Sequence, residues 1–102
     1  MDIDQTLTHA RRRFDHAAAK RQLQEKYQAK MLFAYRGGMW SAGPELLTLL
    51  ETCGDQAEVV VLDLYKNPVK IATAELRNLV FERWQEQMTA WLVEYDQVNR
   101  QR

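Results

Sequence analysis

The segment TAELRNLVFERWQEQMTAWLVEYDQVNR occupies residues 73–100 and carries a long apolar stripe. Its large apolar side chains recur every three or four residues, which places them on one side of an α-helix; they are Leu76, Val80, Trp84, Met88, Trp91, Tyr95 and Val98. Leu79, Phe81 and Leu92 widen the stripe. Such a helix spans roughly 42 Å, which is longer than a small domain needs. We therefore expect one end of it to project or to meet a partner.

The composition indicates one folded domain that covers residues 1–102. Hydrophobic residues make up 46% of the chain and charged residues 27%, a balance that is typical of globular proteins and argues against disorder. The 14 basic and 14 acidic residues leave no net charge, so the overall basic charge of many nucleic-acid-binding proteins is missing.

The charges are nevertheless unevenly distributed along the chain. Residues 1–40 contain eight basic and four acidic groups, which leaves +4, and residues 41–102 therefore carry −4. Halves of opposite charge can attract one another within one chain or between copies.

The sequence contains no feature of a secreted or membrane-spanning protein. Cys53 is the only cysteine, so no disulfide can form within the chain, which fits a reducing compartment. No apolar run approaches the roughly 18 residues of a membrane span, and the acidic start does not resemble a signal peptide. We expect a protein that is not secreted by a signal peptide and has no membrane partner.

Residues 1–30 are predicted to form an N-terminal helix that needs a partner surface. Asp2 or Asp4 can accept hydrogen bonds from the first turn. A narrow apolar line follows heptad spacing and then shifts; it consists of Ile3, Leu7, Ala10, Phe14 and Ala17, and then of Ala19, Leu23 and Tyr27. Because the polar face is broad, we expect this helix to pack against the C-terminal helix or a neighbouring subunit.

Residues 31–72 contain the signals of two strand pairs and a short helix. Apolar runs on both sides of Gly37-Gly38 predict a β-hairpin with a tight turn. Pro44 is suited to the first turn of a helix, and Gly54 to its end. The valine-rich run from Glu58 to Tyr65 is apolar on both faces, which predicts a central strand that is covered on both sides. A turn at residues 66–68 returns the chain as a second short strand.

This order of elements predicts an α+β fold. We expect a small, mostly antiparallel sheet of three or four strands, long N- and C-terminal helices and one short middle helix. Thr73 is expected to cap the C-terminal helix, which covers residues 73–102. Asp63 is the one charge inside the apolar strand, and we expect it to be exposed near the end of that strand.

No set of residues predicts catalysis or metal binding. His9 and His16 are seven residues apart, and a zinc site on a helix uses closer pairs and further ligands. Glu82 and Glu86 lie one helical turn apart without a neighbouring histidine, which favours a solvated face over an acid–base pair. We expect no enzymatic activity, no cofactor and no metal.

The aromatic residues of the C-terminal stripe are the best candidates for a contact surface. Three tryptophans are many for 102 residues, and tryptophan is enriched in protein interfaces. We predict a protein interface, within a homo-oligomer or with another protein, formed by Leu7, Phe14, Trp84, Met88, Trp91 and Tyr95. The alternative is a nucleic-acid contact through the basic residues of the first helix, which are Arg11, Arg12, Arg13, Lys20 and Arg21.

Two stretches carry a resemblance to a known group of proteins. FAYRGGMWSAGPE at residues 33–45 and LDLYKNPVKI at residues 62–71 resemble small uncharacterised proteins of contractile-tailed bacteriophages that infect cyanobacteria. This group of phage proteins supplies no catalytic residues that could be assigned to positions of this sequence. The resemblance implies a phage protein in the host cytoplasm or the virion: a structural component, an assembly factor or a host-directed regulatory factor.

Overall fold

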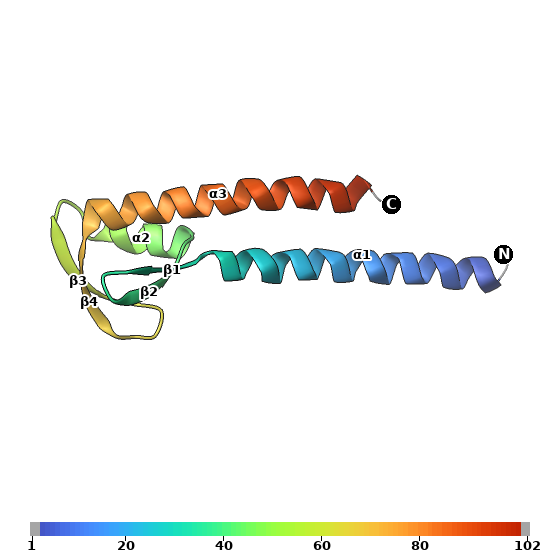
Figure 1. Cartoon of the computed structure of the whole chain (residues 1–102), viewed down its shortest axis with the longest axis horizontal. Coiled ribbons are helices and arrows are strands. Elements are labelled where there is room, and N and C mark those ends of the chain that lie inside the picture. The colour runs from blue at the N-terminus through green and yellow to red at the C-terminus, as the bar shows by residue number, and fades with distance from the viewer. Residues whose placement is uncertain (1–2, 101–102) are drawn as a thin grey trace.

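The computed structural model describes the backbone of residues 3–100 and the side chains of residues 15–100, and the chain divides into a head and an arm (Figure 1). Its helices are α1 (Ile3–Lys30), α2 (Pro44–Thr52) and α3 (Thr73–Arg100). Its strands are β1 (Leu32–Tyr35), β2 (Gly38–Ser41), β3 (Glu58–Leu62) and β4 (Pro68–Ala72). We call residues 31–84 the head, and α1 with residues 85–100 of α3 the arm.

The two long helices run antiparallel and lead away from the hairpins, and α1 extends beyond the end of α3 (Figure 1). The molecule extends over 66 × 23 × 20 Å, and its radius of gyration is 19.4 Å. A compact chain of this length has a radius of gyration of about 13 Å. The expectation that a long helix projects from the domain is therefore confirmed.

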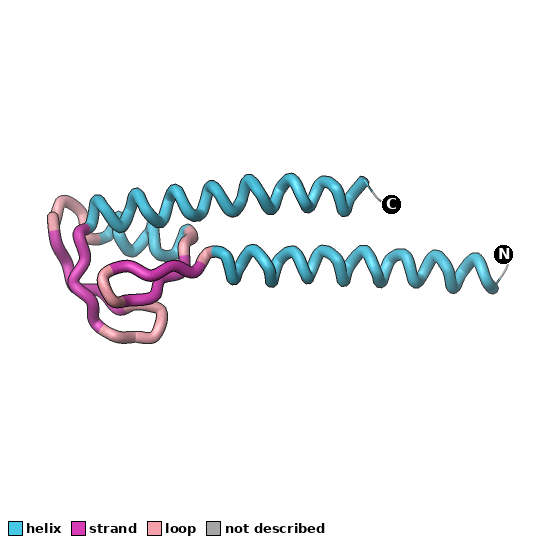
Figure 2. The backbone as a smooth tube through the Cα atoms, viewed as in Figure 1, coloured by secondary structure: helices cyan, strands magenta, loops and turns pink. Residues whose placement is uncertain are grey.

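The α+β class, the long terminal helices and the short middle helix are confirmed. The four strands are antiparallel as predicted, but they form two separate two-stranded sheets, β1–β2 and β3–β4, instead of a single sheet (Figure 2). The described residues of β3 have β4 as their only strand neighbour, so β3 is an edge strand and not the predicted central one.

The turn of the first hairpin lies one residue earlier than predicted. Arg36 and Gly37 both have positive φ, 47° and 80°, which is the pattern of a type I′ turn. Gly38 is the first residue of β2 and pairs with Tyr35. A side chain at Gly38 would begin 3.1 Å from Val69 and 3.2 Å from Asp63, so this residue lets the two hairpins cross closely.

The core of the head lies between the hairpins, α2 and the first two turns of α3. Its largest fully buried side chains are Trp40, Leu50, Ile71, Leu76 and Val80. The ring N–H of Trp40 donates a hydrogen bond to the backbone oxygen of Tyr35 at 3.0 Å, so burial of this ring leaves no unpaired donor. Met31 and Tyr35 are buried in the same cluster, and Phe33 packs beside it.

The β3–β4 sheet covers this core with one face only. Val59 pairs with Ile71 and Val61 with Val69, and these four side chains pack on or within the core. The other face carries Val60 and Leu62, which are exposed. Strand β3 is therefore not covered on both sides.

Asp63 is buried, with 5% of its surface exposed, which corrects the expectation of an exposed acid. Its carboxylate accepts hydrogen bonds from the backbone N–H groups of Met39 at 3.1 Å and of Tyr65 and Asn67 at 2.9 Å. These bonds, the one from Asn67 most strongly, hold the pKa of Asp63 below its usual value against the effect of desolvation. The bond from Met39 ties the turn of the second hairpin to the first.

The N-terminus of α3 also differs from its prediction. Thr73 is the first helical residue and is buried, and its backbone N–H donates to Ala57. Its hydroxyl has no hydrogen-bond partner among the described residues, so the side chain does not act as the expected cap. The helix is fixed at this end by burial of Leu76 and by the backbone bond.

Candidate protein interface

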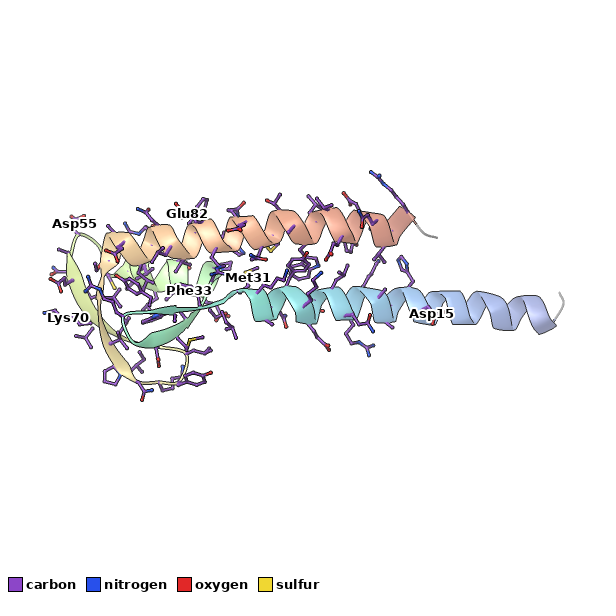
Figure 3. All side chains as sticks on the ribbon, viewed as in Figure 1. Asp15, Met31, Phe33, Asp55, Lys70 and Glu82 are labelled. Atoms are coloured by element: carbon purple, nitrogen blue, oxygen red, sulfur yellow. The ribbon has the colours of Figure 1, made fainter. Side chains whose placement is uncertain are left out.

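The predicted stripe on α3 changes its surroundings as the helix leaves the head. Leu76 and Val80 are fully buried in the core, and Trp84 is half-buried at its border, edge-to-face with Phe81 at 6.3 Å between ring centroids. Beyond Trp84 the only described element beside the stripe is α1. Side chains of the two helices meet between the ribbons there (Figure 3).

A stacked aromatic pair joins the two helices of the arm. The rings of Tyr27 and Trp91 are 5.9 Å apart and nearly parallel, with 7° between their planes, and Tyr27 is buried. Closer to the tip, the ammonium of Lys20 lies 5.2 Å from the centre of the Tyr95 ring, within the range of a cation–π contact. Trp91 and Tyr95 therefore already contact α1 of their own chain.

Glu94 forms the polar connection of the arm. Its carboxylate oxygens accept hydrogen bonds from Nζ of Lys26 at 2.9 and 3.0 Å, and a further one from the hydroxyl of Tyr27. The bond from Lys26, followed by the one from Tyr27, lowers the pKa of Glu94. The same bonds to Glu94 raise the pKa values of Lys26 and Tyr27. The group links α1 and α3 at this point of the arm.

A second line of apolar side chains lies on a flank of α3, next to the side that contacts α1. It consists of Phe81, Met88 and Leu92, which are 52%, 38% and 58% exposed, and we call it the outer stripe. Positions seven and four residues apart lie on one side of a helix. Met88 was predicted as a contact residue, whereas Phe81 and Leu92 were predicted only to widen the stripe. Their heptad spacing from Met88 was the signal that could have identified them.

The outer faces of the two arm helices differ in polarity. The exposed residues of α1 in its last three turns are mainly polar; they are Arg21, Gln22, Gln24, Glu25, Lys26, Gln28, Ala29 and Lys30. The outer side of α3 exposes the outer stripe and, on another flank, Val93. Among the described side chains, the exposed apolar surface of the arm therefore belongs mainly to α3.

A groove between α2 and α3 continues the outer stripe into the head. It has a volume of about 350 Å³ and is lined by Leu47 and Glu51 of α2 and by Arg77, Asn78, Phe81 and Glu82 of α3. Arg77 donates to the backbone oxygen of Leu50 at 3.3 Å, and its Nε is buried without a hydrogen-bond partner among the described residues. Phe81 belongs to both the groove and the outer stripe, so the two form one continuous surface.

The structure places the predicted contact residues in two different settings. Met88 lies on the outer stripe, whereas Trp84 packs against the core and Trp91 and Tyr95 face α1. The side chains of Leu7 and Phe14 lie outside the described residues. The contact with another protein that was predicted for Trp91 therefore competes with its contact inside the chain.

Of the residues predicted to contact nucleic acid, two have described side chains. Arg21 is exposed on α1, and Lys20 is half-buried with its ammonium over Tyr95. The side chains of Arg11, Arg12 and Arg13 lie outside the described residues, as does that of His9.

The described side chains include no group of three or more His, Cys, Asp or Glu residues that could hold a metal ion. His16 is half-buried, and its Nε2 has no partner among these residues. Glu82 and Glu86 are both exposed. Within residues 3–100, no helix is both long enough and apolar enough to cross a membrane.

Comparison with known proteins returned no match to a protein-family model, a curated protein or a solved structure. The resemblance of residues 33–45 and 62–71 to phage proteins therefore remains a hypothesis from the sequence.

Proposed function

We propose that this chain is a non-enzymatic protein that acts by protein–protein contact and self-associates through the outer stripe of α3. The observation that carries the proposal is the exposure of Phe81, Met88 and Leu92 along one line of a helix that has only α1 beside it in the arm. Contiguous exposed apolar surface of this kind marks interaction sites in soluble proteins. The phage context, as a structural or assembly component of a virion, is taken from the resemblance of residues 33–45 and 62–71.

A second copy is the partner that fits the outer stripe best. Two α3 helices that pack antiparallel about Met88 bring Phe81 of each copy close to Leu92 and Tyr95 of the other. The first turn of α3 carries Glu75 and its last turn carries Arg100, so an antiparallel pair brings opposite charges toward each other at both ends. These charges and the opposed helix dipoles favour the antiparallel orientation over the parallel one.

The association adds two helices to the two of the arm and yields a bundle of four. In such bundles, apolar positions at heptad spacing face a common core. Packing of this kind covers the outer stripe, while the polar outer face of α1 stays in water.

The test is the molar mass in solution, measured by sedimentation equilibrium. We expect the wild type to be dimeric at tens of micromolar and Leu92→Glu to be a folded monomer, because a charge in a buried apolar contact is strongly disfavoured. Gln97→Glu is the matched control, since it adds the same charge about 140–180° around the helix from the stripe. A monomeric wild type, or equal masses for all three proteins, would contradict the proposal.

Substitution of Trp91 and Tyr95 is not a clean test of this surface. Trp91 stacks on Tyr27 and Tyr95 contacts Lys20, so their replacement by glutamate also opens the arm of the single chain. Leu92 is more exposed than Trp91 and Tyr95, and no described ring or charge packs on it. Leu92→Glu therefore changes the outer stripe alone.

The alternative proposal is a regulatory phage factor that binds nucleic acid through α1 or acts on the host. Residues 15–30 carry four basic and two acidic groups, which leaves +2. Binding to phosphate must weaken as salt rises. A mobility shift on DNA or RNA that fades with salt and is reduced by Arg21→Gln would support the nucleic-acid form of this alternative, and no shift at low salt would exclude that form.

A further inference from the structure

Strand β3 has the composition of an internal strand but the position of an edge strand. Its residues 59–62 are Val, Val, Val and Leu, a continuous apolar run of the kind found in internal strands that are covered on both faces. In the structure β4 lies on one side of β3 only. Within the described chain, no backbone hydrogen bond beyond the β3–β4 ladder involves residues 59–62. The second edge of β3 therefore has no backbone partner over residues 59–62 of the described chain, and just beyond the strand the Leu64 N–H donates to the backbone oxygen of Met39 at 2.8 Å.

The two strands of this hairpin differ in how well their edges are protected. Strand β4 carries Pro68 and the exposed Lys70, both of which discourage the addition of a further strand. Strand β3 has a single charge, Glu58 at its first position, and this carboxylate lies 3.8 Å from Nζ of Lys70. The central residues of β3 have no such protection.

The exposed face of β3 is also apolar. Val60 and Leu62 are 65% and 54% exposed, and they stand beside Lys70 and Pro68 of β4. Val59 and Val61 on the other face pack on the core, so the strand is held in place. Figure 1 shows β3 at the end of the molecule opposite the two chain ends, and Figure 3 labels Lys70 at this outer end.

We propose that β3 pairs antiparallel with β3 of a second copy about a two-fold axis at Val60. The two hairpins then form one four-stranded sheet in the order β4–β3–β3–β4. In this register Val60 faces Val60, Val59 faces Val61, and Glu58 faces Leu62 of the other copy. This surface is separate from the outer stripe, and the inference does not depend on the proposed function.

The single charge of β3 favours one direction of pairing, and β3 of a second copy is compatible with it. An incoming strand must be extended, apolar in its centre and free of an acid opposite Glu58, and β3 itself meets these conditions when it runs antiparallel. A parallel, in-register pair would place the two Glu58 carboxylates side by side, and like charges on neighbouring strands are destabilising.

The pairing would also change two properties of the single chain. A two-stranded sheet is marginal by itself, and three or more strands with an apolar face are more stable. The exposed Val60 and Leu62 of the two copies would line up along one face of the joined sheet. Because a pair of five-residue strands buries less than the roughly 1,200–2,000 Å² of a standard interface, the association should be reversible and depend on concentration.

Disulfide cross-linking tests this register directly. Val60→Cys and Tyr65→Cys are compared in a Cys53→Ser, Leu92→Glu background, which removes the native thiol and blocks contact through the outer stripe. Residues that face each other in an antiparallel pair have Cα atoms about 4.5–5.5 Å apart, within the range of a disulfide. Tyr65 is the matched control because it is exposed to the same extent, 65%, but lies in the turn outside β3.

We expect Val60→Cys to form a disulfide-linked dimer under mild oxidation roughly tenfold faster than Tyr65→Cys, because pairing raises the local thiol concentration. The dimer should return to monomer with reductant. Equal rates for the two variants would overturn the proposal. Failure of the outer stripe alone would appear differently, as an unchanged mass for Leu92→Glu with the difference between the two cysteine variants intact.

A second variant separates pairing from folding. Val60→Lys places a charge at the proposed axis, and Val60→Thr keeps a β-branched residue there. In the Leu92→Glu background both should retain the circular dichroism of the folded chain. Above the tens of micromolar at which Leu92→Glu alone is expected to be monomeric, the lysine variant should keep the mass of a monomer while the threonine variant associates. Equal association of the two folded variants would also contradict strand pairing.

Discussion

The head and the arm bury their side chains in different ways, although α3 runs through both. In the head, Leu76 and Val80 are enclosed by two hairpins and α2 and are fully buried. In the arm, residues of the same stripe have one helix beside them, and Met88 and Tyr95 keep more than a third of their surface exposed. The comparison shows that an apolar stripe predicts a helix, whereas its burial depends on what lies opposite each turn.

The three tryptophans make this difference measurable, and the largest effect is expected in the head. Trp40→Ala should lower the free energy of unfolding by about 3–5 kcal/mol, because it empties a fully enclosed site. Trp84→Ala should have a smaller effect, because this ring is only half-buried against the core. Trp91→Ala should have the smallest effect, because this half-buried ring packs on α1 in the arm. Chemical denaturation of the three variants gives the order. An equal loss for Trp40→Ala and Trp91→Ala would mean that the arm is packed as tightly as the head.

The next effect concerns the turn of the first hairpin. Gly37 has a φ of 80°, so Gly37→Val should cost at least about 1–2 kcal/mol, the penalty of a left-handed conformation for a residue with a side chain. Lys20→Ala in the arm removes one contact with the Tyr95 ring and serves as the comparison. Thermal unfolding followed by circular dichroism should show a clear drop only for the first variant. Equal melting temperatures for the two variants would contradict a tight turn at Gly37.

A smaller, pH-dependent effect should distinguish Asp63 from the arm. Its folded-state pKa lies below the unfolded value near 3.9, so the carboxylate stabilises the fold above about pH 4 and loses this effect as pH falls through the folded pKa. Asp63→Asn should therefore be less stable than wild type near pH 7, with a difference that narrows toward about pH 3. Denaturant titrations at both pH values measure it, and a constant difference would exclude titration of Asp63 as the cause.

The smallest effect is expected for the polar group of the arm. Glu94 also has a lowered pKa, but its partner Lys26 is exposed, and exposed ion pairs contribute little to stability. Glu94→Gln should leave the denaturation midpoint almost unchanged near neutral pH and at low salt. If instead it matched the effect of Asp63→Asn, the arm would owe its alignment to charge and not to the Tyr27–Trp91 stack.

The features that the sequence predicted correctly are those with local causes. Pro44 and Gly54 mark the ends of α2, and the spacing of apolar residues predicts the long helices. The burial of Asp63 could not be predicted in this way. Its partner at Met39 is a backbone N–H group 24 residues away, and every residue other than proline has such a group, so no side-chain pattern reveals the contact.

The same reason explains what was missed in the sheet and in the candidate interface. The four strands were predicted, but their division into two sheets depends on the close crossing at Gly38, which brings Asp63 and Val69 within 3.2 Å of a side-chain position there. The stripe of α3 was predicted as a whole. Its division into residues that face α1, such as Trp91, and residues of the outer stripe, such as Leu92, depends on where α1 lies across the helix.

The elongated shape determines how this protein diffuses and how it elutes from a sizing column. Its radius of gyration of 19.4 Å is that of a compact protein of roughly 300 residues, nearly three times the length of this chain. A single copy should therefore diffuse slowly and elute early from a sizing column calibrated with globular standards. A monomer could pass there for an oligomer, so the mass of any assembly has to come from light scattering or sedimentation equilibrium, whose results do not depend on molecular shape.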